Sequence, residues 1–212
     1  MDFLMDSWFT VLFSQYANTP THLIVIELIA VFCGVLSVIF AKKQNILVFA
    51  YGIVSTILYV YMFYLHNLWG NMLINAYYTI MSIYGWVLWA QKNVDSEPAL
   101  QVTRATKKQW LVAGIIFILA IIFVTLIYSY QSDFEFNLAS GLDILTTSIC
   151  CSAMWFMAKK IIEHWLLWIL ADTLILPMFF YEKMYFTTLQ FVILTFIAYK
   201  AYIEWKKYLT KN

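Results

Sequence analysis

The sequence is short of charged residues. Lysine, arginine, aspartate and glutamate make up only 12% of its 212 residues, whereas an ordinary soluble domain carries about 25%. Hydrophobic residues make up 63% of the chain, and the mean hydropathy is +0.76. A chain with so little charge cannot cover a water-exposed surface, so the composition excludes a soluble fold and predicts that the protein lies in a lipid bilayer.

Residues that build metal sites and catalytic centres are also scarce. There are three cysteines and three histidines. Cys33, Cys150 and Cys151 lack the spacing of metal ligands, and the histidines lie near the ends of apolar segments. No glycine pattern of a phosphate-binding loop or a dinucleotide-binding motif is present. We therefore expect a protein that is not an enzyme and that uses no metal or cofactor.

Seven apolar segments dominate the chain, and each is near the length needed to cross about 30 Å of hydrocarbon. They are residues 23–41, 46–65, 71–90, 110–130, 142–158, 165–181 and 184–202. Backbone N–H and C=O groups must find their hydrogen bonds within each segment, because lipid offers none, and continuous runs of this length do so as helices. The predicted fold class is an all-α integral membrane protein with seven transmembrane helices.

The distribution of positive charge predicts the orientation. If the seven helices alternate in direction, twelve of the 13 lysines and arginines lie on one side of the membrane, and only Lys183 lies on the other. Cytoplasmic flanks are enriched in these residues, so the N-terminus is expected outside the cell and the C-terminus inside it. Because the cations flank the spans and form no stripe, no nucleic-acid partner is expected.

A spaced motif occurs twice. Cys33 followed by Ala41-Lys42-Lys43 recurs 117 positions later as a cysteine followed by Ala-Lys-Lys at 158–160. The spacing predicts a parallel 3+1+3 repeat, an arrangement in which transporters place a substrate site between the halves; the alternative is chance similarity among apolar helices. The single domain would comprise an interfacial segment at 1–20, repeats at 21–90 and 141–205, and a linking helix at 110–130.

Trp165, Trp168 and Asp172 form the most informative group of side chains. Their spacing of i, i+3 and i+7 places them on one helix face. A carboxylate inside a membrane costs several kcal/mol unless it faces a cavity or a partner. Two indoles beside it suit a flat cationic ring, which gains roughly 0.5–2 kcal/mol from a cation–π contact. We predict a substrate site here; the alternative is two interfacial tryptophans and an acid that pairs with a neighbouring helix.

Two stretches carry a resemblance to a known family. Residues 165–172, WLLWILAD, resemble the WxxWxxx[N/D] signature of the Pnu-type bacterial vitamin transporters, and residues 84–89, YGWVLW, are similar to the YGWxxW end of their third helix. The resemblance spans nearly the whole chain. It implies a SWEET-like arrangement in the bacterial inner membrane, facilitated diffusion without a coupling ion, trapping of the substrate by intracellular phosphorylation, and an assembly that allows a homotrimer.

The last signature position bears on the substrate. Members similar to the nicotinamide riboside transporters usually carry Asn there, whereas members resembling the thiamine transporters carry Asp, so Asp172 points to thiamine. The aminopyrimidine of thiamine can also form paired hydrogen bonds with a carboxylate. We therefore expect a thiamine transporter, with nicotinamide riboside as the alternative substrate. A membrane-embedded vitamin sensor or enzyme is the alternative of another class.

Polar side chains on other spans complete the predicted substrate site. The candidates are Asp143, Asn75, Gln190 and Ser55. Asp143 is a second acid within an apolar segment and matches Glu27 in the first half of the chain. For the three neutral residues the alternative is hydrogen bonding between helices, which accounts for most such side chains in membranes.

Overall fold

The computed structural model describes residues 20–92, 99–130, 136–181 and 185–209. Seven helices account for most of them. They are α2 (Thr21–Lys42), α3 (Leu47–Leu65), α4 (Trp69–Ala90), α5 (Lys107–Ser129), α6 (Leu138–Ala158), α7 (His164–Tyr181) and α8 (Tyr185–Leu209). For the described residues, the prediction of an all-α fold with seven helices is confirmed. Residues 1–19 of the predicted interfacial segment, and Lys183, lie outside the described residues.

Five of the described helices are long and apolar enough to cross a membrane, namely α2, α3, α5, α6 and α7. The other two, α4 and α8, contain 22 and 25 residues, which corresponds to about 33 and 38 Å at 1.5 Å per residue. Both are long enough to cross the hydrocarbon core but are more polar, because α4 carries Asn71 and Asn75 and α8 ends in Lys206 and Lys207. Five of the seven predicted spans therefore have both the length and the apolarity needed to cross a membrane.

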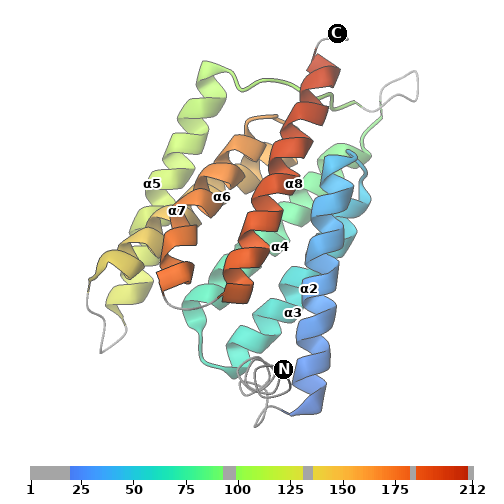
Figure 1. The fold of residues 1–212 in the computed structure, drawn as a ribbon. Helices are drawn as coiled ribbons and strands as arrows, with labels where there is room; N and C mark the ends of the chain where they lie inside the picture. Colours follow the sequence, from blue (N-terminus) through green and yellow to red (C-terminus); the bar gives the residue numbers. More distant parts are fainter. Residues whose placement is uncertain (1–19, 93–98, 131–135, 182–184, 210–212) are drawn as a thin grey trace, which may run out of the picture.

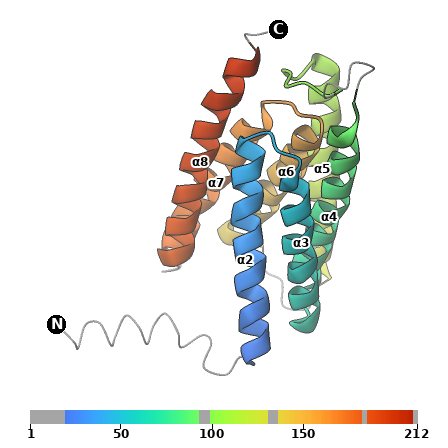
Figure 2. The same cartoon turned by 90° about the vertical axis from the view of Figure 1, so that its right-hand side faces the viewer.

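Six of the helices close into a ring. Neighbours in sequence pack in the order α2–α3–α4 and α6–α7–α8, and the two groups meet where α4 packs on α6 and where α8 packs on α2. The remaining helix, α5, packs against both members of the α4–α6 pair. All seven helices run roughly along one axis (Figures 1 and 2).

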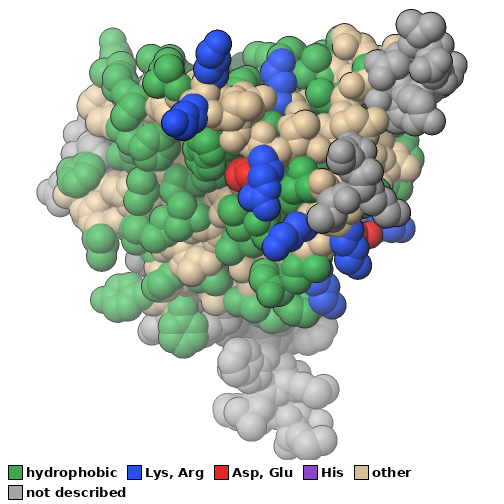
Figure 3. All heavy atoms as spheres, turned by 90° about the horizontal axis from the view of Figure 1, so that it is seen from above, with side chains coloured by type: hydrophobic (Ala, Val, Ile, Leu, Met, Phe, Trp, Pro, Cys, Tyr) green, Lys and Arg blue, Asp and Glu red, His purple; other side chains and the backbone are tan. Residues whose placement is uncertain are grey.

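Lysine and arginine side chains gather at the end of the bundle that is seen from above in Figure 3. We call this the basic end; α2, α4, α6 and α8 end there, at the top of Figure 1. The loops after α2 and α6 turn in the same way, because Gln44 and Lys160 adopt left-handed φ angles of 53° and 58°. In each loop the next amide donates to the carbonyl five positions back, at 3.0 and 2.9 Å. Both helices thus end in a Schellman-type turn.

Aromatic side chains fill the core at the basic end. Phe49, Trp89, Trp165 and Trp205 belong to one cluster of buried residues. Phe49 packs edge-on against Trp89 with ring centroids 5.0 Å apart, and Trp165 packs edge-on against Trp205 at 5.8 Å. His164 is fully buried beside the second pair, with its ring 4.8 Å from that of Trp205. This packing closes the ring of helices at the basic end.

The α4–α5 linker is fixed to the loop between α6 and α7. The Thr103 amide donates to the Lys160 carbonyl at 3.2 Å, and the Ile162 amide donates back to the Thr103 carbonyl at 2.9 Å. Glu163, which is 9% exposed, accepts from the Ala105 amide at 2.9 Å. These bonds join the segment before α5 to the loop between α6 and α7. They therefore hold the start of α5 against the group formed by α6, α7 and α8.

Candidate substrate-binding site

The seven predicted site residues lie in different surroundings. Asp172, Trp165 and Trp168 lie on α7. Asp143 of α6 and Asn75 of α4 line one cavity towards the end opposite the basic end. The other two, Ser55 of α3 and Gln190 of α8, belong to neither group.

Asp172 is buried within the helix bundle. It is 8% exposed, so its carboxylate does not face the lipid. Thr195 of α8 donates to it over 3.4 Å, but the same hydroxyl makes a shorter bond of 2.8 Å to the Phe191 carbonyl. Among the described residues, no lysine or arginine forms an ion pair with this carboxylate. A buried acid with one long hydrogen bond and no ion pair among the described residues is typical of a functional site in a membrane protein.

Trp168 lies at the boundary between the two groups of helices. Its indole is half-buried, and its ring centroid is 6.5 Å from that of Tyr78, which belongs to α4. Two aromatic rings from opposite halves of the ring of helices therefore approach each other one helical turn from Asp172. The spacing on α7 predicted the indole but nothing predicted Tyr78, because a tyrosine within an apolar run carries no distinctive spacing.

Trp165 lies deeper in the aromatic core than its spacing with Trp168 suggested. It is 3% exposed and contacts both Trp205 and His164, with ring centroids 5.8 and 4.4 Å away. Within the described part of the chain, its indole Nε1 and the Nε2 of His164 have no hydrogen-bond partner. Trp165 thus forms part of the closed basic end, and a ligand could reach it only if that packing changed.

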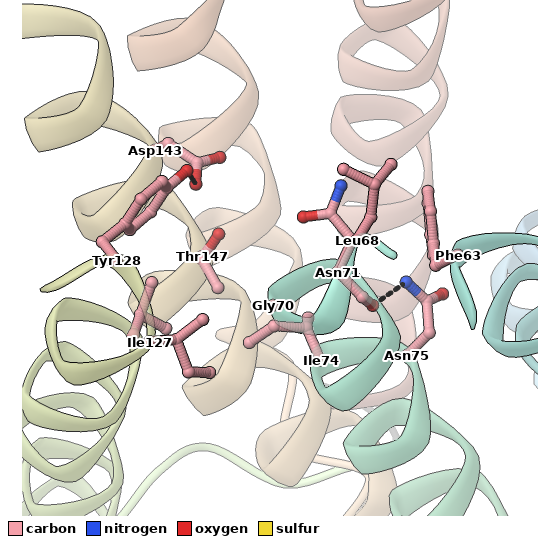
Figure 4. Close-up of a pocket in the computed structure, with 11 residues that line it drawn as sticks. Phe63, Leu68, Gly70, Asn71, Ile74, Asn75, Ile127, Tyr128, Asp143 and Thr147 are labelled. Atoms are coloured by element: carbon pink, nitrogen blue, oxygen red, sulfur yellow. Dashed lines mark hydrogen bonds between the residues drawn. The ribbon is translucent and has the colours of Figure 1, made fainter. Parts of the chain in front are cut away.

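Asp143 and Asn75 face a cavity of about 340 Å³ between α4, α5 and α6 (Figure 4). This volume falls within the range of roughly 300–1,000 Å³ for small-molecule sites. Tyr128 of α5 donates its hydroxyl to Asp143 Oδ2 at 2.7 Å. On the opposite wall, Asn75 donates from Nδ2 to the carbonyl of Asn71 at 2.9 Å. One wall therefore presents a negative charge and the other presents amide groups.

Three polar lining residues of this cavity, Asn71, Thr147 and Tyr128, were not identified from the sequence. Asn71 lies one turn before Asn75, so an i, i+4 pair of asparagines was the available signal. Thr147 lies one turn after Asp143 on α6 in the same way. Tyr128 gave no such signal, because tyrosines are common at the ends of membrane helices and its contact with the acid depends on how α5 packs against α6.

Ser55 and Gln190 lie away from both groups. Ser55 is buried and donates its hydroxyl to the Ala30 carbonyl at 2.8 Å, which joins α3 to α2. This is the interhelical hydrogen bond considered as the alternative for this residue. Gln190 is exposed on α8, next to Leu189, which is also exposed. The geometry thus gives Ser55 a structural role and brings Gln190 into neither group.

The α4–α6 interface continues from the cavity towards the basic end. Tyr77 of α4 donates its hydroxyl to the Cys151 carbonyl of α6 at 2.8 Å, about two turns deeper than Asp143. Asp143 thus lies further from the basic end than this contact, whereas Asp172 belongs to α7, which packs against α6.

Residues 24–207 match the family model described as nicotinamide mononucleotide transporter. The chain belongs to this family. It is 23% identical to the nicotinamide riboside transporter PnuC of Escherichia coli (strain K12) over 201 residues, which cover 85% of this chain and 84% of that protein. It is 26% identical to the nicotinamide riboside transporter PnuC of Neisseria mucosa over 151 residues, which cover 69% of this chain and 56% of that protein.

A solved structure agrees with the fold. The crystal structure of the vitamin B3 transporter PnuC superposes with a TM-score of 0.67 and covers 95% of this chain and 87% of its own, at 21% identity. The resemblance to Pnu-type transporters is thus confirmed. The protein is a multi-pass membrane protein of a transporter family.

Proposed function

We propose that this family member carries a flat, positively charged vitamin precursor across the bacterial inner membrane, with nicotinamide riboside as its first candidate substrate. The observation that carries the proposal is the buried Asp172 carboxylate, which lacks a protein cation among the described residues and lies one turn from Trp168. The relatives from Escherichia coli and Neisseria mucosa are nicotinamide riboside transporters, which supports the choice of substrate.

This choice departs from the sequence-based expectation of thiamine. That expectation depended mainly on Asp172 in place of Asn, and the relatives favour the riboside instead. Thiamine remains the second candidate because of the same residue. Both molecules carry a quaternary ring nitrogen, which a carboxylate attracts equally, but only the aminopyrimidine can form paired hydrogen bonds with it.

The proposed binding mode uses the charge and the rings together. A cationic ring beside Trp168 and Tyr78 would gain roughly 0.5–2 kcal/mol from cation–π contact. Its charge would neutralise Asp172, which an apolar surrounding otherwise destabilises. A neutral ring of the same shape would keep the stacking but lose the ionic interaction, so the site should select for positive charge.

We also propose that the two three-helix groups are halves of a parallel 3+1+3 repeat within one domain. Helix packing supports this, because α4 meets α6 as α8 meets α2. Matching contacts occur 116 positions apart: Phe49 packs edge-on against Trp89, and Trp165 packs edge-on against Trp205. Gln44 and Lys160, which both have left-handed φ angles, are also 116 positions apart. This spacing is one residue shorter than the 117 positions that separate the two sequence motifs.

The same offset relates the proposed site to a neutral counterpart. Asp172 and Thr195 join α7 to α8, and the equivalent positions, Thr56 and Thr79, join α3 to α4 with their hydroxyl oxygens 2.7 Å apart. Only the second half therefore carries a carboxylate at this position. A repeat that is symmetric in its fold but carries its charge in one half would bind a polar substrate in one orientation.

The proposed transport cycle follows from the two ends of the bundle. The cluster of cations at the basic end favours a cytoplasmic location for that end, with the N-terminus outside and the C-terminus inside. The aromatic core closes that end, while the cavity lies towards the other. Rocking of the halves would expose Asp172 to each side in turn. We expect facilitated diffusion, so accumulation in the cell would require intracellular phosphorylation of the substrate.

Uptake into proteoliposomes tests the proposal. Nicotinamide riboside, thiamine and riboflavin are supplied outside vesicles that contain the purified protein, and the internal concentration is followed to equilibrium. We expect a cationic substrate to reach, but not exceed, its outside concentration. A sensor or an enzyme would bind or convert the vitamin without moving it. Size measurement of the detergent-solubilised protein tests the homotrimer implied by the resemblance.

A substitution at Asp172 tests the site itself. Asp172→Asn keeps the size of the side chain and removes its charge, so calorimetry should show binding of the cationic substrate weakened by more than tenfold. Thr195→Val is the companion variant, because it removes only the weak 3.4 Å hydrogen bond and should change affinity by less than threefold. Unchanged affinity in Asp172→Asn would contradict the assigned role.

A further inference from the structure

We propose that the cavity between α4, α5 and α6 is a separate entry site for the cationic substrate, at which Asp143, positioned by Tyr128, binds the substrate before Asp172 does. This inference rests on the proposed function. It assigns the two membrane acids different tasks: Asp143 captures the substrate from the outer solution, and Asp172 holds it at the centre of the bundle.

The cavity has the side chains that such a site needs. Tyr128 donates to Asp143 Oδ2 at 2.7 Å, which fixes the carboxylate at the cavity wall. A carboxylate has a second oxygen, so the group can accept this bond and still attract a cation. Asn71 and Asn75 lie on the facing wall (Figure 4), and their amide groups can donate to and accept from the hydroxyl groups of a nucleoside sugar. The cavity thus suits a hydroxylated cation.

The two acids lie too far apart for one charge to contact both. Ala158, at the end of α6, and His164, at the start of α7, both lie at the basic end. At 1.5 Å per residue, Asp143 lies about 22 Å and Asp172 about 12 Å from that end along their helices. The carboxylates are therefore separated by roughly 10 Å along the bundle axis, whereas an ion pair requires about 4 Å. A single cationic centre would occupy them in turn.

The helix interface beyond the cavity is closed in this conformation. Tyr77 donates to the Cys151 carbonyl at 2.8 Å, and Trp89 donates to the Ala158 carbonyl at 3.2 Å, both between α4 and α6. These bonds lie between the cavity and the basic end. A substrate at Asp143 would consequently remain in the cavity until the halves move, so capture and deeper binding are separate steps.

Capture by a fixed charge has a kinetic signature. A carboxylate that lines a low-dielectric cleft raises the local concentration of cations and accelerates their association. Salt weakens this attraction, because the Debye length falls from about 30 Å at 0.01 M to about 10 Å at 0.1 M ionic strength. Removing the charge at Asp143 should therefore slow entry, and most strongly at low salt, without changing the final affinity at Asp172.

The test compares entry with equilibrium binding in the same variants. Initial uptake of nicotinamide riboside into proteoliposomes is measured below half-saturation at low and at high salt, and its affinity for the detergent-solubilised protein is measured by calorimetry. We expect Asp143→Asn to reduce initial uptake at least fivefold at low salt, with affinity changed less than twofold. Tyr128→Phe should reduce uptake about twofold, because it frees the carboxylate without removing it. Asp172→Asn should lose affinity as well as uptake.

Two controls keep the result specific. Tyr130→Phe removes a hydroxyl from a 93% exposed side chain just beyond α5, outside the cavity, and should leave uptake unchanged. Asp143→Glu retains the charge and should recover most of the uptake, whereas a damaged fold would not recover. Equal loss of affinity in Asp143→Asn and Asp172→Asn would overturn the entry site in favour of one extended site that uses both acids.

Other outcomes separate this inference from the proposed function. Normal uptake by Asp143→Asn, with active wild-type protein, would overturn the entry site alone. If the wild-type protein moves neither nicotinamide riboside nor thiamine, the proposed function and the entry site both fail.

Discussion

Trp89 and Trp205 face each other at the basic end with their ring centroids 6.1 Å apart, and each donates its indole N–H to the end of a helix in the other half. Trp89 donates to the Ala158 carbonyl at 3.2 Å, and Trp205 donates to the Lys42 carbonyl at 3.1 Å. The last carbonyls of a helix have no donor within the helix. The two indoles therefore cap α6 and α2, and they join the halves through reciprocal bonds.

We predict that Trp89→Phe and Trp205→Phe each destabilise the protein, and by similar amounts. Phenylalanine keeps the aromatic packing but removes the N–H donor, and a buried carbonyl left without a partner costs about 1–3 kcal/mol. Thermal unfolding in detergent measures the loss. Trp110→Phe is the control, because Trp110 is 46% exposed and should tolerate the change. Destabilisation by only one of the two core substitutions would contradict the equivalence of the two contacts.

Gly85 allows close packing at the same end of the bundle. A Cβ atom at this position would overlap the ring of Phe49, which is fully buried and cannot move aside. Gly85→Ala should lower stability by about 1–3 kcal/mol, as overpacking of a core does. The matched variant Gly114→Ala has nothing within 4 Å of the added methyl group and should be neutral or slightly stabilising. Equal melting temperatures for the two variants would argue against the packing at Gly85.

We predict that the buried carboxylate of Asp172 lowers the stability of the ligand-free protein. A buried carboxylate without a protein cation pays a desolvation penalty. We expect Asp172→Asn to raise the melting temperature of the ligand-free protein, by about 2–4 °C for each kcal/mol recovered. The same variant should lose the stabilisation that saturating nicotinamide riboside gives the wild type, about 2.7 kcal/mol at 100 times the Kd. A lower melting temperature without ligand would show that the acid has a stabilising partner.

Burial of Lys160 at the basic end should make the stability of the protein depend on pH. Its ammonium group donates to the Leu100 carbonyl at 3.1 Å and lies 4.7 Å from the Trp89 ring centroid, and burial lowers the pKa of Lys160. The unfolded chain keeps this proton to a higher pH, so raising the pH towards the ordinary lysine value of 10.5 favours the folded protein. The melting temperature of the wild type should therefore rise relative to that of Lys160→Met as the pH increases.

The control for this measurement is Lys108→Met, a change at an exposed side chain at the start of α5. Each variant is compared with the wild type at every pH, which cancels the titration of groups common to all three proteins. A wild-type advantage that stays constant or shrinks with increasing pH would contradict the effect of burial on Lys160.

Much of the fold could be predicted from the sequence, because hydrophobic runs are local. The described helices begin and end within a few residues of the predicted spans, apart from α6, which begins four residues earlier, and α8, which continues to Leu209 beyond the predicted 202. The continuation has a physical reason: the amphipathic end of α8 carries Lys206 and Lys207, which interrupt the apolar run but not the helix. Apolarity locates the part of a helix in lipid and not its full length.

The arrangement of the site was less predictable. The spacing of Trp165, Trp168 and Asp172 correctly indicated one helix, but a helix face does not reveal what lies opposite it. Trp165 contacts Trp205, and Trp168 approaches Tyr78, two neighbours that are 40 and 90 positions away in sequence. Both contacts depend on the packing of α7 against other helices.

The sequence by itself determined that the protein lies in a membrane, that its described residues form seven helices, and that it belongs among the Pnu-type transporters, since composition, run length and short motifs are properties of neighbouring residues. Only the tertiary structure decided that Tyr128 holds Asp143, that Ser55 binds a backbone carbonyl, and that two matching aromatic contacts lie 116 positions apart. Each of these facts joins two helices. Their relative rotation and depth depend on how all the side chains between them pack, which no local pattern records.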